Sequence, residues 1–116
     1  MEIAVKRVYE TPAKSDGMRI LVERLWPRGL TKEKASIDLW IKEIAPSTAL
    51  RQWFGHVSEK WDEFCTRYWE ELSKNSNNVE LLKKQCKGNK VTFVYAAKDE
   101  QRNSAVALRA FLKKKG

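Results

Sequence analysis

Metal-binding and redox-active residues are scarce in this sequence. The 116 residues include one histidine and two cysteines, and no Cys-x-x-Cys pair occurs. Zinc sites and thioredoxin-like sites need more of these residues at closer spacing, so neither is indicated. Neither cysteine begins a phosphate-cradling loop of the kind that cysteine-based phosphatases use. Cys65 and Cys86 are therefore expected to be inert thiols on the apolar faces of helices.

Long hydrophobic segments and internal repeats are absent as well. No apolar run approaches the roughly 20 residues of a membrane-spanning helix. The N-terminal stretch carries Glu2 and Lys6 where a signal peptide would be apolar, which favours a cytoplasmic protein. Without repeats or a low-complexity linker, residues 1–116 are predicted to form a single domain.

The motifs that identify many enzymes from sequence are also missing. No Gly-rich phosphate loop, dinucleotide fingerprint or nucleophile elbow occurs, so no cofactor is predicted. What the chain has in excess is positive charge, because 23 Lys and Arg face 15 Asp and Glu, for a net charge of +8. Such a surface suits nucleotides, phosphorylated metabolites or nucleic acid. Lysines on polar helix faces fit a simple solvated surface equally well.

The hydrophobic pattern predicts strands that alternate with helices. Residues 2–9 and 18–25 have the alternation of strands, with Met18, Ile20 and Val22 on one face and Glu23 on the other. The stretch at 90–97 is almost continuously apolar, which is typical of a central strand in a parallel sheet.

The helical segments are marked by their caps and by apolar spacings of three and four. Thr31 can cap a short turn, and Pro46 with Ser47 precedes a helix over 48–54. Residues 36–46 fit a strand and a helix about equally, and we favour the strand. Further helices are predicted after Ser58 with an apolar face from Trp61 to Leu72, from Asn77 to Gly88, and over 103–114.

These elements predict an α/β fold, with a small, mostly parallel sheet that has helices on both faces. The carboxyl ends of parallel strands gather at one edge of the sheet, and ligands of open α/β sheets usually bind there. The loops that follow residues 18–25 and 90–97 should therefore lie together. Lys6 and Arg7 should lie near the same edge.

The first of these loops has the unusual sequence RLWPRG (24–29). Pro27 fixes one backbone angle and Gly29 permits a tight turn, while Trp26 can wedge against the core. A turn so anchored would aim Arg24 and Arg28, and guanidinium groups bind phosphate or carboxylate with paired hydrogen bonds. The alternative is that both arginines only form internal bridges.

The second loop, AAKDEQRN (96–103), supplies Lys98, Asp99, Arg102 and Asn103. Asp99 and Asn103 fit an acid–base residue with an orienting amide, and they equally fit turn and cap residues. His56 is the one side chain whose ordinary pKa lies near neutrality. It fits a general base or a phosphate contact, and it equally fits a helix-end residue.

The chain contains the stretches VKRVY, RLWPRGL, LWIKEIAPS, LRQWFGH and YAAKDEQRN. Together they resemble the YeaO-like family, small bacterial proteins with a domain of unknown function. The resemblance covers nearly the whole chain and implies an α/β domain in a bacterial or archaeal cytoplasm, with no activity to carry over. The chain departs from the family at Arg102, where a histidine often stands. This exchange either removes an activity or replaces a titrating group by a fixed cation.

Three classes of function are compatible with these features. We favour a protein that binds a small anionic or phosphorylated ligand and that also converts it if the site is catalytic. Arg24 and Arg28 would hold the anion, with Trp26, Lys98, Arg102 and Asn103 beside it, while His56 or Asp99 moves a proton. The alternatives are a basic nucleic-acid-binding or regulatory protein, for which no motif is visible, and a protein-binding module with exposed tryptophans.

Overall fold

The computed structural model describes residues 2–115 and contains one four-stranded sheet. The strands lie in the order β1-β4-β2-β3, and every pairing is parallel. The strands are β1 (Glu2–Arg7), β2 (Met18–Leu21), β3 (Leu39–Trp40) and β4 (Lys90–Tyr95), and the helices are α1 (Lys32–Ala35), α2 (Thr48–Phe54), α3 (Trp61–Ser73), α4 (Ser76–Cys86) and α5 (Ser104–Lys115). This confirms the predicted α/β fold. None of the helices in the described residues has both the length and the apolar character needed to cross a membrane.

Strand β4 is the centre of the sheet, as its continuous apolar sequence predicted. It pairs with β1 on one side and with β2 on the other, and its residues from Val91 to Tyr95 are buried. A strand that is covered on both faces loses no stability by being apolar on both, which explains the absence of charge between Lys90 and Lys98.

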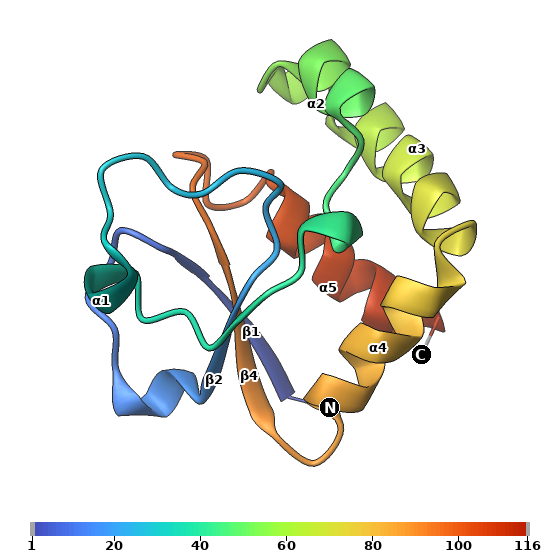
Figure 1. The fold of residues 1–116 in the computed structure, drawn as a ribbon. Coiled ribbons are helices and arrows are strands. Elements are labelled where there is room, and N and C mark those ends of the chain that lie inside the picture. The colour runs from blue at the N-terminus through green and yellow to red at the C-terminus, as the bar shows by residue number, and fades with distance from the viewer. Residues whose placement is uncertain (1, 116) are drawn as a thin grey trace.

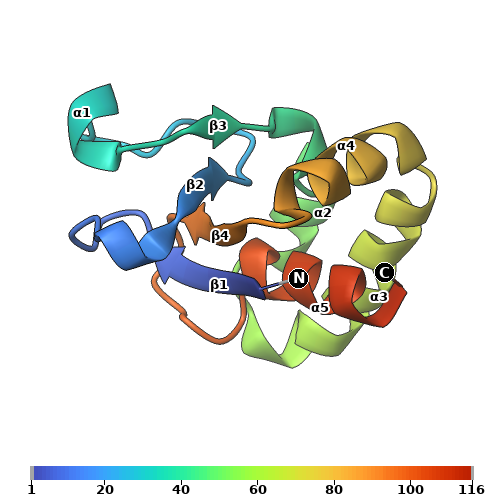
Figure 2. The same cartoon turned by 90° about the horizontal axis from the view of Figure 1, so that it is seen from below.

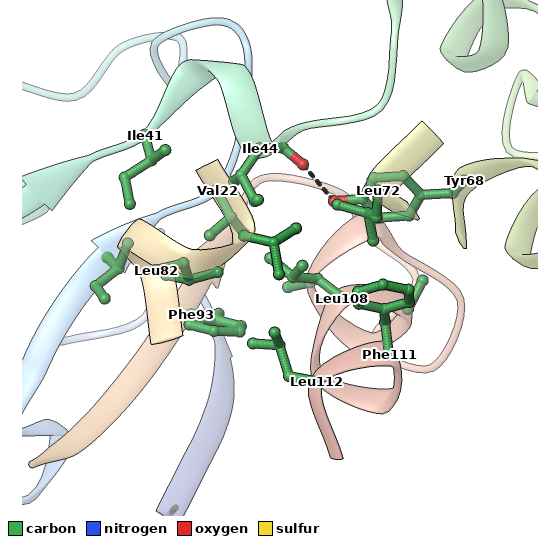
Figure 3. Close-up of a cluster of buried hydrophobic side chains, with 14 of the residues drawn as sticks. Val22, Ile41, Ile44, Tyr68, Leu72, Leu82, Phe93, Leu108, Phe111 and Leu112 are labelled. Atoms are coloured by element: carbon green, nitrogen blue, oxygen red, sulfur yellow. Dashed lines mark hydrogen bonds between the residues drawn. The ribbon is translucent and has the colours of Figure 1, made fainter. Parts of the chain in front are cut away.

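The two faces of the sheet are covered unequally. Helices α3, α4 and α5 pack on one face, around Ile20, Val22 and Phe93, and Figure 3 shows this core with the Tyr68 hydroxyl directed at the Ile44 carbonyl. On the other face, α1 and the loops around it cover Leu21 and Val94. Figures 1 and 2 show the large helices on one side of the strands and the single turn of α1 on the other.

Several predicted boundaries are wrong in detail. Pairing of β2 ends at Leu21, and the carbonyl of Glu23 accepts the indole N–H of Trp40 instead of a strand N–H. Glu23 therefore turns toward α2 rather than to the face opposite Val22. The ambiguous stretch 36–46 contains the two-residue strand β3 followed by a 3-10 turn.

Two predicted caps are also wrong. Ser58 begins a 3-10 turn, and its hydroxyl bonds the side chain of Glu59 instead of capping α3. Helix α4 begins at Ser76 after the flanking residue Asn75, which lies two residues before the predicted cap Asn77. The apolar spacing therefore predicted the position of both helices correctly, whereas the polar residues near their starts did not predict the first helical residue.

A buried charged cluster lies beneath the loop between β1 and β2. Asp16 accepts hydrogen bonds from Arg19 at 2.7 Å, from Lys6 at 3.1 Å and from the N–H of Ala13 at 3.0 Å. Burial alone would raise the pKa of Asp16, but the Ala13 N–H and the two cations outweigh it and hold the pKa below the ordinary 3.8. Sequence reasoning placed Lys6 at the ligand-binding edge, whereas it pairs with Asp16.

Gly17 is the position where the backbone demands glycine. Its φ is +66°, and a Cβ atom there would lie 2.3 Å from the carbonyl oxygen of Lys90. We expect Gly17→Ala to lower the free energy of unfolding by about 2 to 3 kcal/mol, from backbone strain and the displacement of β4. Urea denaturation measures this loss.

Gly88 offers the matched control for that substitution. Its φ is +76°, but a Cβ atom there would meet open space. Gly88→Ala should cost only about 1 kcal/mol, because strain at a positive φ is not joined by a clash. Equal losses at the two positions would show that the close approach to Lys90 is unimportant.

Candidate functional site

A pocket of about 250 Å³ lies at the edge of the sheet where β2 and β4 end. Figure 1 shows the loops after these two strands at the same end of the sheet. The strands bring together segments distant in sequence, and α2 and α3 close the side. The lining residues are Glu23, Arg51, Phe54, His56, Phe64, Ala96, Ala97, Asn103 and Ser104.

A second, more open hollow of about 470 Å³ adjoins this pocket. It is lined by His56, Ala96, Ala97, Lys98 and Asp99, so it shares three residues with the first. His56 thus contacts both hollows, and Lys98 and Asp99 lie outside the mouth of the smaller one. His56, Lys98, Asp99 and Asn103 are the predicted site residues that the fold gathers here.

The floor of the pocket is held in place by Arg7. Its guanidinium donates to the carbonyl of Ala97 at 2.8 Å and to that of Ala96 at 3.3 Å. Arg7 comes from β1, two strands away from Glu23, so it fixes the start of the loop after β4 across the sheet. Arg7 thus uses two of its five N–H donors in this structural role.

Glu23 is the acidic residue of the pocket, and sequence reasoning did not select it. The N–H of Ala96 donates to its carboxyl at 3.4 Å, and the indole of Trp40 holds its carbonyl at 2.7 Å. Burial raises the pKa of Glu23, while the Ala96 N–H and the charge of Arg51 oppose the rise. A carboxyl group is therefore held, mostly buried, in a pocket wall.

Arg51 is the basic residue of the pocket and was also missed. It lies on α2 one turn before Gly55, whose N–H bonds the Arg51 carbonyl to end the helix. Within residues 2–115 its guanidinium forms neither an ion pair nor a hydrogen bond. His56 follows Gly55 and has a φ of +60°, which reverses the direction of the chain. Its imidazole ring is exposed, and the ring centroid lies 6.0 Å from that of Phe54.

The residues of the RLWPRG turn do not line the pocket. The Arg24 guanidinium donates to the carbonyls of Ala45 at 3.0 Å and of Pro46 at 3.3 Å, and it thereby ties the turn to the start of α2. Arg28 is exposed, and its backbone carbonyl accepts the hydroxyl of Tyr9. Arg24 and Arg28 therefore contact different parts of the chain, and neither lines the pocket.

Trp26 anchors the same turn. Its indole N–H donates to the carbonyl of Leu30 at 2.7 Å, which closes the turn, and its ring packs edge-on against Trp40 at 5.4 Å. The pair of tryptophans covers the face of the sheet opposite the large helices. Trp26 thus anchors the turn, but the turn does not direct Arg24 or Arg28 into the pocket.

The loop after β4 has the geometry of a turn followed by a helix cap. One oxygen of Asp99 accepts the N–H groups of Gln101 and Arg102, and the other lies 3.5 Å from the Arg102 guanidinium. The Gln101 N–H, together with the Arg102 contacts, lowers the pKa of Asp99 below its ordinary 3.8. Asn103 caps α5 by accepting the N–H of Val106 at 3.0 Å.

The sequence contained a weak signal for the two missed residues. Glu23 is the only acid in the predicted second strand, and Arg51 stands in the unusual stretch LRQWFGH beside His56. No group of three His, Cys, Asp or Glu side chains that could hold a metal ion occurs in the part of the chain that the structure describes. The charged side chains of the pocket, Glu23 and Arg51, lie beside the aromatic rings of Phe54 and Phe64.

Comparisons with known proteins match this chain along nearly its full length. A family model described as the inactive DUF488-N3 subclade matches residues 2–115. The Escherichia coli protein titled uncharacterized protein YeaO is 40% identical over 113 residues, which cover 97% of this chain and 98% of that protein. An uncharacterized protein of Mycobacterium tuberculosis is 40% identical over 110 residues, covering 95% and 92%. No solved structure matches the chain.

Proposed function

The chain belongs to the family described as the inactive DUF488-N3 subclade, and its identity to YeaO confirms the predicted YeaO-like membership. From that premise we propose that it binds a small anionic molecule without converting it. The binding site is the pocket at the carboxyl edge of the sheet. The observation that carries the proposal is the guanidinium of Arg51, which lines this pocket and is without a partner in residues 2–115. The word inactive in the family description supports binding rather than turnover.

Other groups around the pocket support an anionic ligand. His56 contacts the pocket from its rim, and Lys98 lies in the adjoining hollow. Asn103 and Ser104 stand at the start of α5, where the helix dipole and free N–H groups favour negative charge. The net charge of +8 raises the local concentration of anions near such a site.

The size of the pocket restricts the ligand. Its volume of about 250 Å³ is smaller than the roughly 300 to 1,000 Å³ typical of sites for drug-sized molecules. We therefore propose a small metabolite whose charged group enters the pocket, with any larger remainder in the adjoining hollow. A polymer such as nucleic acid would have to bind through one terminal group.

The roles of the predicted catalytic residues follow from their contacts. Asp99 uses its carboxyl to hold the loop that leads into α5, so its proposed role is positioning. His56 makes no side-chain hydrogen bond to an orienting acid in the described chain, so we assign it a ligand contact rather than the role of a base. Arg102 pairs with Asp99 and is not among the residues that line either hollow, so its proposed role is also to hold this loop.

A thermal-shift panel tests the proposal. The purified chain is heated in low-salt buffer with inorganic phosphate, nucleoside monophosphates, phosphorylated sugars, amino acids and small carboxylates. A ligand at a hundredfold excess over its Kd should add about 2.7 kcal/mol of stability, which raises Tm by several degrees. If no compound in the panel raises Tm, the proposed function is wrong.

A further inference from the structure

Two opposite charges line the pocket without forming an ion pair. Glu23 enters from the end of β2 and Arg51 from α2, and each contributes to the wall of the same 250 Å³ cavity. They are close enough for the charge of Arg51 to act on the carboxyl of Glu23. Yet no salt bridge joins them anywhere in the described structure, so both charges remain available to a third partner.

This arrangement disfavours a ligand that carries only negative charge. Such a ligand would be attracted by Arg51 and repelled by the Glu23 carboxylate within the same small volume. The carboxyl receives a single, long hydrogen bond, from the Ala96 N–H at 3.4 Å. Within residues 2–115 it has no further donor, although a carboxylate can accept about four hydrogen bonds. The group therefore has acceptor capacity left for a ligand.

We propose that the ligand is amphoteric, with an acidic group bound by Arg51 and an N–H donor group bound by Glu23. This inference rests on the proposed function, because it concerns the same pocket. The donor group is an amine, an amidine or the adjacent N–H groups of a nucleobase, since each satisfies a carboxylate with charge-assisted or paired hydrogen bonds.

The apolar part of the wall fits the middle of such a molecule. The rings of Phe54 and Phe64 stack at 4.5 Å between centroids, and both line the pocket beside the two charges. They offer an apolar surface to a ring or a short carbon chain that separates the acidic group from the donor group. Glu23 itself is pre-positioned by Trp40 and Ala96, which limits the entropy lost on binding.

Two sources supply this chemistry, and matched ligands distinguish them. Calorimetric titration of the wild-type chain compares phenylalanine with 3-phenylpropionate, which lacks the amine, and guanosine monophosphate with ribose 5-phosphate, which lacks the base. We expect one of the two complete ligands to bind about ten- to a hundredfold more tightly than its partner without donors. Equal affinity within both pairs would overturn the inference.

The variant Glu23→Gln tests the residue itself. Its amide keeps the shape and can still accept the Ala96 N–H, so the fold should be retained. The better complete ligand should lose about tenfold or more in affinity, whereas inorganic phosphate should bind more tightly once the repulsion is gone. Glu43→Gln removes the same charge from an exposed position and should change neither value.

The outcomes separate the inference from the proposed function. If phosphate binds the wild type as well as the complete ligands do, and Glu23→Gln leaves that ratio unchanged, the inference is wrong and anion binding stands. If neither phosphate nor any other compound binds, both are wrong. Should Glu23→Gln fail to fold, the matched ligands on the wild-type chain still decide the inference.

Discussion

Replacing Asp16 by alanine is expected to lower the free energy of unfolding by about 3 to 5 kcal/mol, a large part of the stability of a small domain. Asp16 is 7% exposed and neutralises Arg19, which is 3% exposed. The substitution leaves Arg19 buried with only the carbonyls of Ala35 and Ser36 as partners. It also removes the carboxylate partner of Lys6, which keeps only the carbonyl of Thr11. Urea denaturation followed by tryptophan fluorescence measures the loss.

A surface ion pair provides the control for this prediction. Glu63 and Arg67 pair one turn apart on α3, and both side chains are about half exposed. Glu63→Ala should therefore change the free energy of unfolding by less than about 1 kcal/mol. A loss at Asp16 no larger than the loss at Glu63 would contradict the assignment of a buried charged cluster.

The same residue predicts the acid dependence of stability. Because the folded pKa of Asp16 lies below its ordinary 3.8, the stabilisation is fully present above that value and is lost as the pH falls through the folded pKa. Wild-type stability should thus decline steeply below about pH 4. The free energy of unfolding of the alanine variant should decline less steeply with falling pH. Denaturation curves recorded between about pH 2.5 and pH 6 measure this difference in slope.

Replacing Arg51 by glutamine is expected to weaken binding of inorganic phosphate, or of the best ligand from the thermal panel, by about ten- to a hundredfold. A hydrogen bond to a charged group contributes about 1.5 to 3 kcal/mol, and each 1.4 kcal/mol is a factor of ten in Kd. Stability should hardly change, because the guanidinium has no partner among residues 2–115. Calorimetric titration measures the affinity, and a denaturation curve checks the fold.

Arg28→Gln is the matched control, because it removes the same charge from an exposed loop at the same edge of the sheet. It should leave the affinity within about twofold of wild type. A large loss at Arg28 with none at Arg51 would instead place the anion at the RLWPRG turn, as the sequence had suggested.

The fold followed from the sequence because its signals are strong and local. The almost continuously apolar sequence of β4 marked the central strand, and the apolar spacing of Phe64, Tyr68 and Leu72 marked the buried face of α3. The ends of elements were less predictable. Where β2 stops depends on Trp40, which lies 17 residues away from the Glu23 carbonyl that its indole binds.

The site was predicted less well, because an arginine in a sequence does not show which acceptor it will find. Arg7, Arg19 and Arg24 all donate to backbone carbonyls of segments distant in sequence, so these guanidinium groups stabilise the fold. Arg51 lies in the helical part of the stretch LRQWFGH, where nothing in its spacing distinguishes it from the other arginines, yet it is the arginine that lines the pocket. Which cations stay available is decided by tertiary contacts that no local pattern reports.

The central claim is that anions bind where β2 and β4 end, and an NMR titration with inorganic phosphate in low-salt buffer tests it most directly. The account predicts that the backbone amides of Ala96, Ala97 and Ser104, with those around His56, shift together and saturate with one dissociation constant. Shifts that instead gather on the lysines of α4 and the end of α5, or that never saturate, would contradict it.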